Sequence, residues 1–192
     1  MGKKAITRNL FHLKKGYIRL MTFKKIFVIA LVIVAAFYVF KVKGFNPFVS
    51  KIKGDIALTL IDGKTTTLDE CAGENGTFIF DMGTWCPHCS GEVDRLKSLN
   101  EFFKTHKISV LIGMEGDSKD EIHSWVYRHD FPWNWKTFYW YSTHDKEFNV
   151  KVDGVPYLIV RNKNGVKTFN KAGVYPTDYL SKLALDMLKS NK

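Results

Sequence analysis

A buried strand that runs directly into a pair of closely spaced cysteines is the feature that most constrains how this chain can fold. Residues 76–82, GTFIFDM, are an apolar run suited to a buried strand, and GTWCPHC follows from Gly83. Apolar residues then recur at spacings of three and four, which predicts an amphipathic helix from Pro87 to near His106. The apolar positions are Val93, Leu96, Leu99, Phe102 and Phe103. Cys86 and Cys89 therefore lie at a strand-to-helix junction.

The remaining elements alternate between strands and helices. Residues 55–70 predict a hairpin turning at Asp62-Gly63, and residues 108–113 predict a second buried strand. Ser118, with Glu121 three residues later, predicts the start of a helix that ends near His129.

The C-terminal part adds a second hairpin and a last helix. Asn164-Gly165 predicts the hairpin turn, and residues 176–190 predict an amphipathic helix with proline in its first turn. The order of elements predicts an α/β fold, with a mixed central sheet and helices on both faces.

The N-terminal part differs in composition from the rest. Eight of the 29 Lys and Arg residues lie in the first 40 residues, which contain no Asp or Glu, and the other 21 nearly balance the 19 acidic residues. The folded domain therefore lacks the strong positive charge of a nucleic-acid binder, and we expect no nucleic-acid partner.

An unbroken apolar run at residues 26–40 indicates a membrane segment. It would span about 22 Å as a helix, against a hydrocarbon core of about 30 Å, so either an uncleaved anchor or a cleaved signal peptide fits, and we favour the anchor. Positive flanking charges predict residues 1–25 to be a basic cytoplasmic tail. Residues 41–54 are interpreted as a linker and residues 55–192 as an exported domain at the bacterial inner membrane, on its periplasmic side.

Three hypotheses fit Cys86 and Cys89. A zinc site needs about four ligands, but Cys71 is the only other cysteine and the histidines have no ligand spacing. A purely structural disulfide across so short a loop would restrain the unfolded chain very little. Redox exchange is favoured, because a helix N-terminus stabilises the Cys86 thiolate and Cys89 lies one turn away to resolve a mixed disulfide.

Neighbouring residues suit this interpretation. Pro87 fits the first turn of a helix, where its missing N–H costs nothing. His88 either adds positive charge beside the thiolate or is an exposed histidine without a role.

WCPHC after a buried strand, with Gly-Val-Pro before a later strand, resembles the thioredoxin superfamily. The resemblance implies a thioredoxin-like fold for the domain, a cis Pro156 facing the cysteines, and a Val155 backbone that pairs with an incoming peptide. A trans proline is the alternative. No bound cofactor is implied, only a redox-active Cys86–Cys89 disulfide, and no metal.

Within this superfamily, the sequence is most similar to the membrane-anchored TlpA/ResA-like branch. Residues 60–68, Trp85, Glu92, residues 131–133 and residues 148–160 carry this similarity. It implies a thiol–disulfide oxidoreductase that reduces exported cysteine-containing proteins, such as apocytochrome c during cytochrome c maturation, with a thiol protein of the membrane as electron donor or acceptor.

Some residues depart from this branch. Pro87-His88 and the valine before Pro156 resemble the oxidase DsbA, so a disulfide-forming oxidase stays an alternative, and a copper- or zinc-holding module is a further one. Asp81 lies one place after the buried acid of many thioredoxins, and strand side chains alternate, so it cannot simply take that role.

Three features have two interpretations each. Glu92, one turn beyond Cys89, either transfers the proton of the resolving thiol or is a surface residue. Cys71 is expected to be a buried thiol rather than a third redox centre. Seven aromatic residues in residues 131–141 either pack the core or form an exposed surface for a client protein or membrane.

Overall fold

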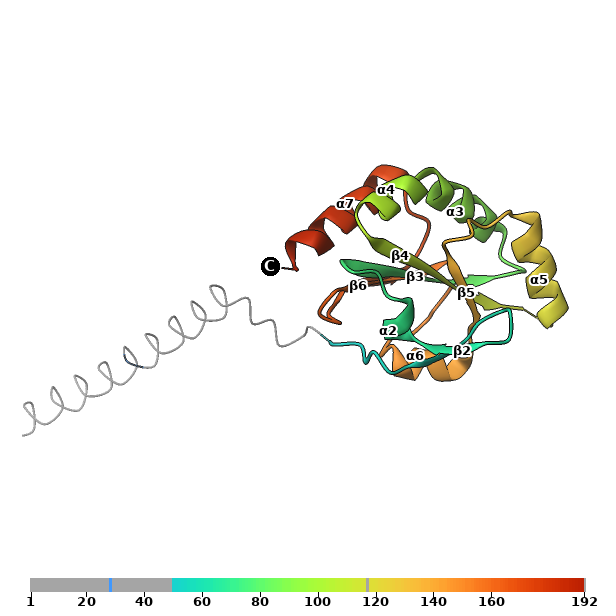
Figure 1. Cartoon of the computed structure of the whole chain (residues 1–192), viewed down its shortest axis with the longest axis horizontal. Coiled ribbons are helices and arrows are strands. Elements are labelled where there is room, and N and C mark those ends of the chain that lie inside the picture. Colours follow the sequence, from blue (N-terminus) through green and yellow to red (C-terminus); the bar gives the residue numbers. More distant parts are fainter. Residues whose placement is uncertain (1–27, 29–49, 117, 192) are drawn as a thin grey trace, which may run out of the picture. The chain divides into compact units, whose positions relative to one another are not determined.

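The computed structural model describes Val28, residues 50–116 and residues 118–191 (Figure 1). The expected anchor at residues 26–40 lies outside the described residues, apart from Val28. Within the described residues, no helix combines the length and the apolar character needed to cross a bilayer.

A five-stranded mixed sheet forms the centre of the domain, in the order β5-β4-β3-β6-β7. β3 (Gly76–Gly83) is central and pairs in parallel with β4 (Ile108–Glu115), which pairs in parallel with β5 (Lys136–Tyr139). On the other side, β6 (Tyr157–Asn162) and β7 (Lys167–Ala172) run antiparallel. The prediction of a mixed sheet is confirmed.

Helices cover both faces of this sheet (Figure 1). One face carries α3 (Pro87–Ser98), α4 (Asn100–Thr105), α5 (Lys119–Arg128) and α7 (Thr177–Lys189). The other carries α2 (Leu68–Cys71), α6 (Ser142–Glu147) and the hairpin of β1 (Ala57–Thr59) and β2 (Thr65–Thr67). Two buried apolar clusters result, one on each face.

Alternation along β3 decides which side chains reach which cluster. Phe78, Phe80 and Met82 join the cluster under α3, together with both cysteines of the pair, whereas Ile79 joins the opposite cluster. The β3 strand therefore places Cys86 at one end of the sheet and on the face covered by α3.

Both predicted hairpins are present. Gly63 has φ +86° between β1 and β2, and Gly165 has φ +79° between β6 and β7, conformations that glycine adopts without steric cost. Ser118 caps α5 by accepting a hydrogen bond from the backbone N–H of Glu121 at 3.1 Å.

The structure differs from the expected elements in three places. The helix expected to run to His106 breaks at Leu99, where ψ is 0°, so that α4 turns and Phe103 packs 5.0 Å from Phe78. α6 was not predicted, because residues 142–147 are polar and lack apolar periodicity. Pro176 precedes α7 as its N-cap rather than lying in the first turn.

The folded domain also begins earlier than the expected boundary at residue 55. Ile52 is buried and its N–H donates to the Gly165 carbonyl at 2.8 Å, and Lys51 forms a β-bridge with Val166. The linker interpretation is therefore wrong for residues 50–54, because Ile52 fills the cluster beneath β6. A single apolar residue between two lysines is too weak a sequence pattern to predict this packing.

Candidate active site

The cysteine pair lies where β3 ends and α3 begins. Cys86 is the N-cap residue of α3 and Pro87 occupies its first position, so Cys86 faces the helix end where backbone N–H groups lack intrahelical partners. Cys86 and Cys89 form a disulfide with Cα atoms 5.5 Å apart. Cys86 is 5% exposed and Cys89 is fully buried, so only the first sulfur is open to attack.

The Val155-Pro156 loop lies against this disulfide. The Cys86 Sγ is 3.5 Å from the Val155 carbonyl oxygen, and the Val155–Pro156 peptide bond is cis, as the resemblance implies. The pairing of Asp81 with Tyr157 brings the loop to this position, since β6 starts directly after Pro156. Residues distant in sequence thus form one site through the β3–β6 register.

Trp85 and His88 are exposed beside the pair. Trp85 is 63% exposed and its indole lies over Gly83, where a Cβ atom would approach Trp85 Cε2 to 2.7 Å. His88 lies in the first turn of α3 with its side chain exposed. Both residues can therefore contact a molecule that approaches Cys86.

Glu92 is fully buried on the face of α3 that also carries Cys89. One carboxylate oxygen accepts from Arg95 at 3.2 Å and from the backbone N–H of Tyr175 at 3.4 Å, whereas Oε1 has no partner among the described residues. Burial raises the pKa of Glu92, against the smaller opposing effects of Tyr175 and Arg95. The surface-residue interpretation of Glu92 is wrong.

A groove of about 480 Å³ adjoins Cys86 on the side of α5. Sequence reasoning missed the residues at the C-terminal end of α5 that line it, namely Trp125, Arg128 and the C-cap residue His129. No local spacing could have revealed them, because only the packing of α5 against the α3 end of the sheet brings them to the cysteines.

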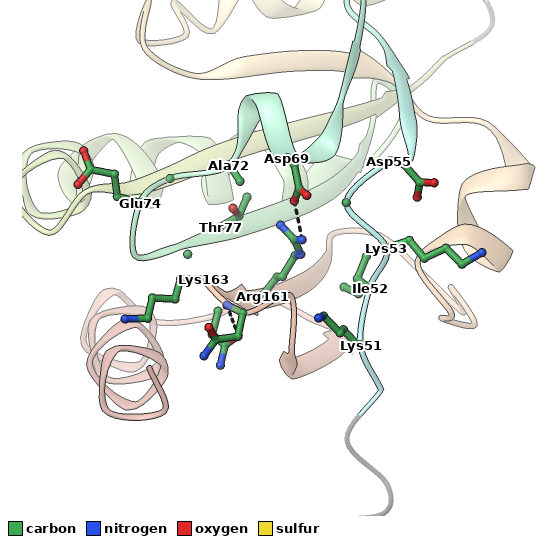
Figure 2. Close-up of a pocket in the computed structure, with 15 residues that line it drawn as sticks. Lys51, Ile52, Lys53, Asp55, Asp69, Ala72, Glu74, Thr77, Arg161 and Lys163 are labelled. Atoms are coloured by element: carbon green, nitrogen blue, oxygen red, sulfur yellow. Dashed lines mark hydrogen bonds and ion pairs between the residues drawn. The ribbon is translucent and has the colours of Figure 1, made fainter. Parts of the chain in front are cut away.

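A larger cavity of about 970 Å³ lies at the opposite end of β3, away from the cysteines (Figure 2). It surrounds the ion pair of buried Arg161 with Asp69 at 2.6 Å, and it is lined by residues of the segment before β1, the α2–β3 loop and the β6–β7 turn. The larger of these two cavities is therefore not the one beside the reactive residues, and the candidate active site is identified by the cysteine pair.

A family model matches residues 50–153, more than half of the chain, and describes the AhpC/TSA family. The chain belongs to the AhpC/TSA family. The matched range contains the cysteine pair, Glu92 and the α5 groove, and it ends just before the Val155-Pro156 loop. A search of curated proteins found no match in sequence.

Solved structures resemble this AhpC/TSA-family chain in fold. A secreted thiol-disulfide isomerase from Corynebacterium glutamicum has a TM-score of 0.65 at 17% identity, covering 76% of this chain and 89% of that one. A thiol:disulfide interchange protein, thioredoxin family protein from Chlorobium tepidum has 0.62 at 13%, covering 72% and 96%.

A secreted disulfide oxidoreductase from Mycobacterium tuberculosis, homologous to E. coli DsbE, has a TM-score of 0.57 at 16% identity, covering 69% of this chain and 96% of that one. At these identities the likeness establishes a thioredoxin-like fold. Together with the family and the cysteine pair at the helix tip, it gives the architecture of a thiol–disulfide oxidoreductase.

Cys71 lies in the apolar cluster on the sheet face opposite the pair. It is 9% exposed, and burial raises the pKa of its thiol, which disfavours the reactive thiolate. The prediction of a buried thiol is confirmed. Within the described part of the chain, no group of three or more His, Cys, Asp or Glu side chains is placed to hold a metal ion.

The aromatic segment has two kinds of residue. Trp135, Phe138, Tyr139 and Trp140 are buried around β5 and its neighbours. Trp133 is 88% exposed and Tyr141 46% exposed. The segment therefore serves mainly as core, and it leaves single aromatic side chains at the surface.

Proposed function

We propose that the chain is an extracytoplasmic thiol–disulfide oxidoreductase that exchanges dithiol and disulfide with exported cysteine-containing proteins. The observation that carries the proposal is the position of Cys86: its sulfur is at the tip of α3, bonded to Cys89 and 3.5 Å from the Val155 carbonyl. A nucleophile, a resolving group and a backbone segment that can pair with a client thus lie at one site.

In the reduced protein, the Cys86 thiolate attacks one sulfur of a client disulfide. A mixed disulfide forms, and the other client sulfur leaves as a thiolate that takes up a proton. Cys89 then attacks the Cys86 sulfur, which closes the Cys86–Cys89 disulfide and releases the second client thiolate. Two electrons pass from the protein to the client. The α3 N-terminus favours this order, because it stabilises the Cys86 thiolate that makes the first attack.

Glu92 accepts the proton of Cys89 as the resolving thiol becomes a nucleophile. Its burial on the Cys89 face of α3 and its raised pKa fit a group that changes protonation during the reaction. The client main chain pairs with the Val155 backbone beside Pro156, while Trp85, Pro87 and His88 contact client side chains.

We place the domain on the periplasmic side of the inner membrane, held by an anchor at residues 26–40, with a membrane thiol protein as electron donor. The proposed direction is reduction, with apocytochrome c among the clients. The resemblance of the overall sequence layout to the TlpA/ResA-like branch supports this direction.

Oxidation is the second candidate direction. The dipeptide Pro87-His88 and the valine before Pro156 favour it, because they resemble an oxidase. A positive His88 beside the Cys86 thiolate would stabilise the reduced form and make the protein a stronger oxidant.

The reduction potential of the Cys86–Cys89 pair decides between the two directions. Equilibration of the full chain in detergent with glutathione buffers, followed by alkylation and mass spectrometry, measures it, with Cys86→Ser as the blank. A reductase is expected near the value of thioredoxin, about −270 mV, and an oxidase near that of DsbA, about −120 mV. A chain that never equilibrates with the buffers would contradict both.

A further inference from the structure

The groove beside Cys86 is built by two helices. Its lining comes from the β3–α3 junction and α3 on one side and from the last turn of α5 on the other. The lining residues are Thr84, Trp85, Cys86, Pro87, Ser90, Trp125, Arg128 and His129. Because Cys86 is one of them, a client cysteine joined to Cys86 has a neighbouring side chain at the groove.

The groove carries positive charge. Its lining contains Arg128 and no Asp or Glu. Arg128 Nε donates to the Ser124 carbonyl at 3.3 Å, which directs the side chain along the last turn of α5. The terminal nitrogens of Arg128 make no hydrogen bond or ion pair with the described residues, so they are free to bind an anionic group. The positive end of α3 adds to this field.

The walls of the groove are aromatic and fixed in place. Trp125 is 4% exposed and lies against His129, with ring centroids 3.9 Å apart and ring planes tilted by 30°. His129 Nδ1 lies 2.8 Å from the Trp125 carbonyl oxygen, to which it donates, and this bond sets the ring orientation. Trp85 lies over Gly83 on the other side. An apolar wall with one unpaired guanidinium suits a side chain that has a short apolar stem and a carboxylate.

We propose that this groove selects client segments that carry Asp or Glu beside the reacting cysteine, and that Arg128 binds the carboxylate. The proposal deepens the proposed function and rests on it, since it concerns the choice of client at the same cysteine pair. Val155 binds any backbone alike, whereas Arg128 distinguishes clients by charge.

The test uses two peptide disulfides and the reduced full chain in detergent. Each peptide has one cysteine, flanked by Asp in the first and by Lys in the second, and is supplied as its disulfide-linked dimer. The protein dithiol reduces each dimer to two free thiols, and chromatography follows the loss of the dimer. Each rate is divided by the rate with dithiothreitol, which corrects for the intrinsic reactivity of the peptide.

The wild-type chain is expected to prefer the Asp peptide by about fivefold, the value of one partly exposed charge pair. Arg128→Gln should remove most of the preference and Arg128→Glu should reverse it, a gain toward the Lys peptide that misfolding cannot produce. Lys146→Glu, the same charge change on exposed α6, should keep the wild-type ratio. Sodium chloride at about 1 M should reduce the preference by screening.

The outcomes separate the two claims. Equal corrected rates for both peptides, or a preference that survives Arg128→Glu, would overturn the groove proposal while leaving the exchange activity intact. A wild-type chain that reduces neither peptide and does not exchange with glutathione would instead overturn the proposed function.

Discussion

Asp81 is a buried carboxylic acid on the face of β3 opposite the cysteines. It is 1% exposed, and neither carboxyl oxygen has a hydrogen-bond partner among the described residues. Burial, with smaller contributions from Glu115 and Asp145, raises the pKa of Asp81 to about 9. Asp81 is therefore protonated at neutral pH in the folded chain, and its position on the other face agrees with the alternation argument made from the sequence.

This raised pKa makes stability depend on pH. The folded state keeps the Asp81 proton up to about pH 9, whereas the unfolded chain loses it near its ordinary pKa of 3.8, so the free energy of unfolding falls as pH rises between these values. Asp81→Asn removes this dependence. Urea unfolding should show the variant gaining about 4 to 5 kcal/mol over the wild type between pH 4.5 and pH 8, because nearly the whole interval lies between the two pKa values.

Exposed Asp94 on α3 provides the matched control for that experiment. Asp94→Asn should follow the wild-type curve at both pH values. If Asp81→Asn and the wild type instead keep a constant difference across the range, Asp81 is ionised in the folded chain and the burial argument is wrong.

Glu92 is expected to control the pH dependence of exchange. Its carboxylate accepts a proton only above its raised pKa, so the contribution of Glu92 to the rate grows as pH rises through that pKa. Glu92→Gln should slow reduction of a peptide disulfide by about a hundredfold and remove this limb of the rate profile. Stopped-flow measurements over pH 4 to 8 test it, with exposed Glu101→Gln as control; an unchanged profile would exclude the proton-transfer role.

Among the elements, α5 positions the groove through its N-terminal cap. Ser118 accepts from the Glu121 N–H, and the far end of the same helix carries Trp125, Arg128 and His129. Ser118→Ala should lower the free energy of unfolding by about 1 kcal/mol. Ser124→Ala, exposed within the helix, should leave it nearly unchanged; equal effects of both substitutions in urea unfolding would argue against capping.

The sequence predicted those elements whose signals are local. Gly63 and Gly165 mark their hairpins, Ser118 marks α5, and the apolar run before Cys86 marks β3, because turn, cap and strand preferences act over a few residues. The break at Leu99 was missed because apolar spacing continues across it. The break places Phe103 against Phe78, a tertiary contact that apolar spacing does not encode.

For the candidate active site too, the sequence predicted the residues that belong to local motifs and missed those brought in by long-range contacts. Cys86, Cys89 and Pro156 follow from short motifs, and their meeting follows from the family resemblance. The burial of Glu92 depends on the Tyr175 segment, and the groove depends on α5; both are long-range contacts that no spacing in the sequence encodes.

At the scale of the whole molecule, the proposed anchor determines where the exchange occurs. If residues 26–40 remain as an uncleaved anchor, the full chain should stay in the membrane pellet of expressing cells after washing with sodium carbonate, and protease added outside the inner membrane should digest the domain. A soluble chain that begins after residue 36 would instead show that the run is a cleaved signal peptide.

The thioredoxin-like sheet brings Cys86 to a helix tip, and the reactivity of that sulfur is the central claim. Its most direct test is the rate of iodoacetamide alkylation of Cys86 in the reduced full chain as a function of pH, read by mass spectrometry with buried Cys71 as the internal slow thiol. The account predicts a half-maximal rate at about pH 7.5 or below, against about 8.5 for a free cysteine. A midpoint at or above that of free cysteine would contradict it.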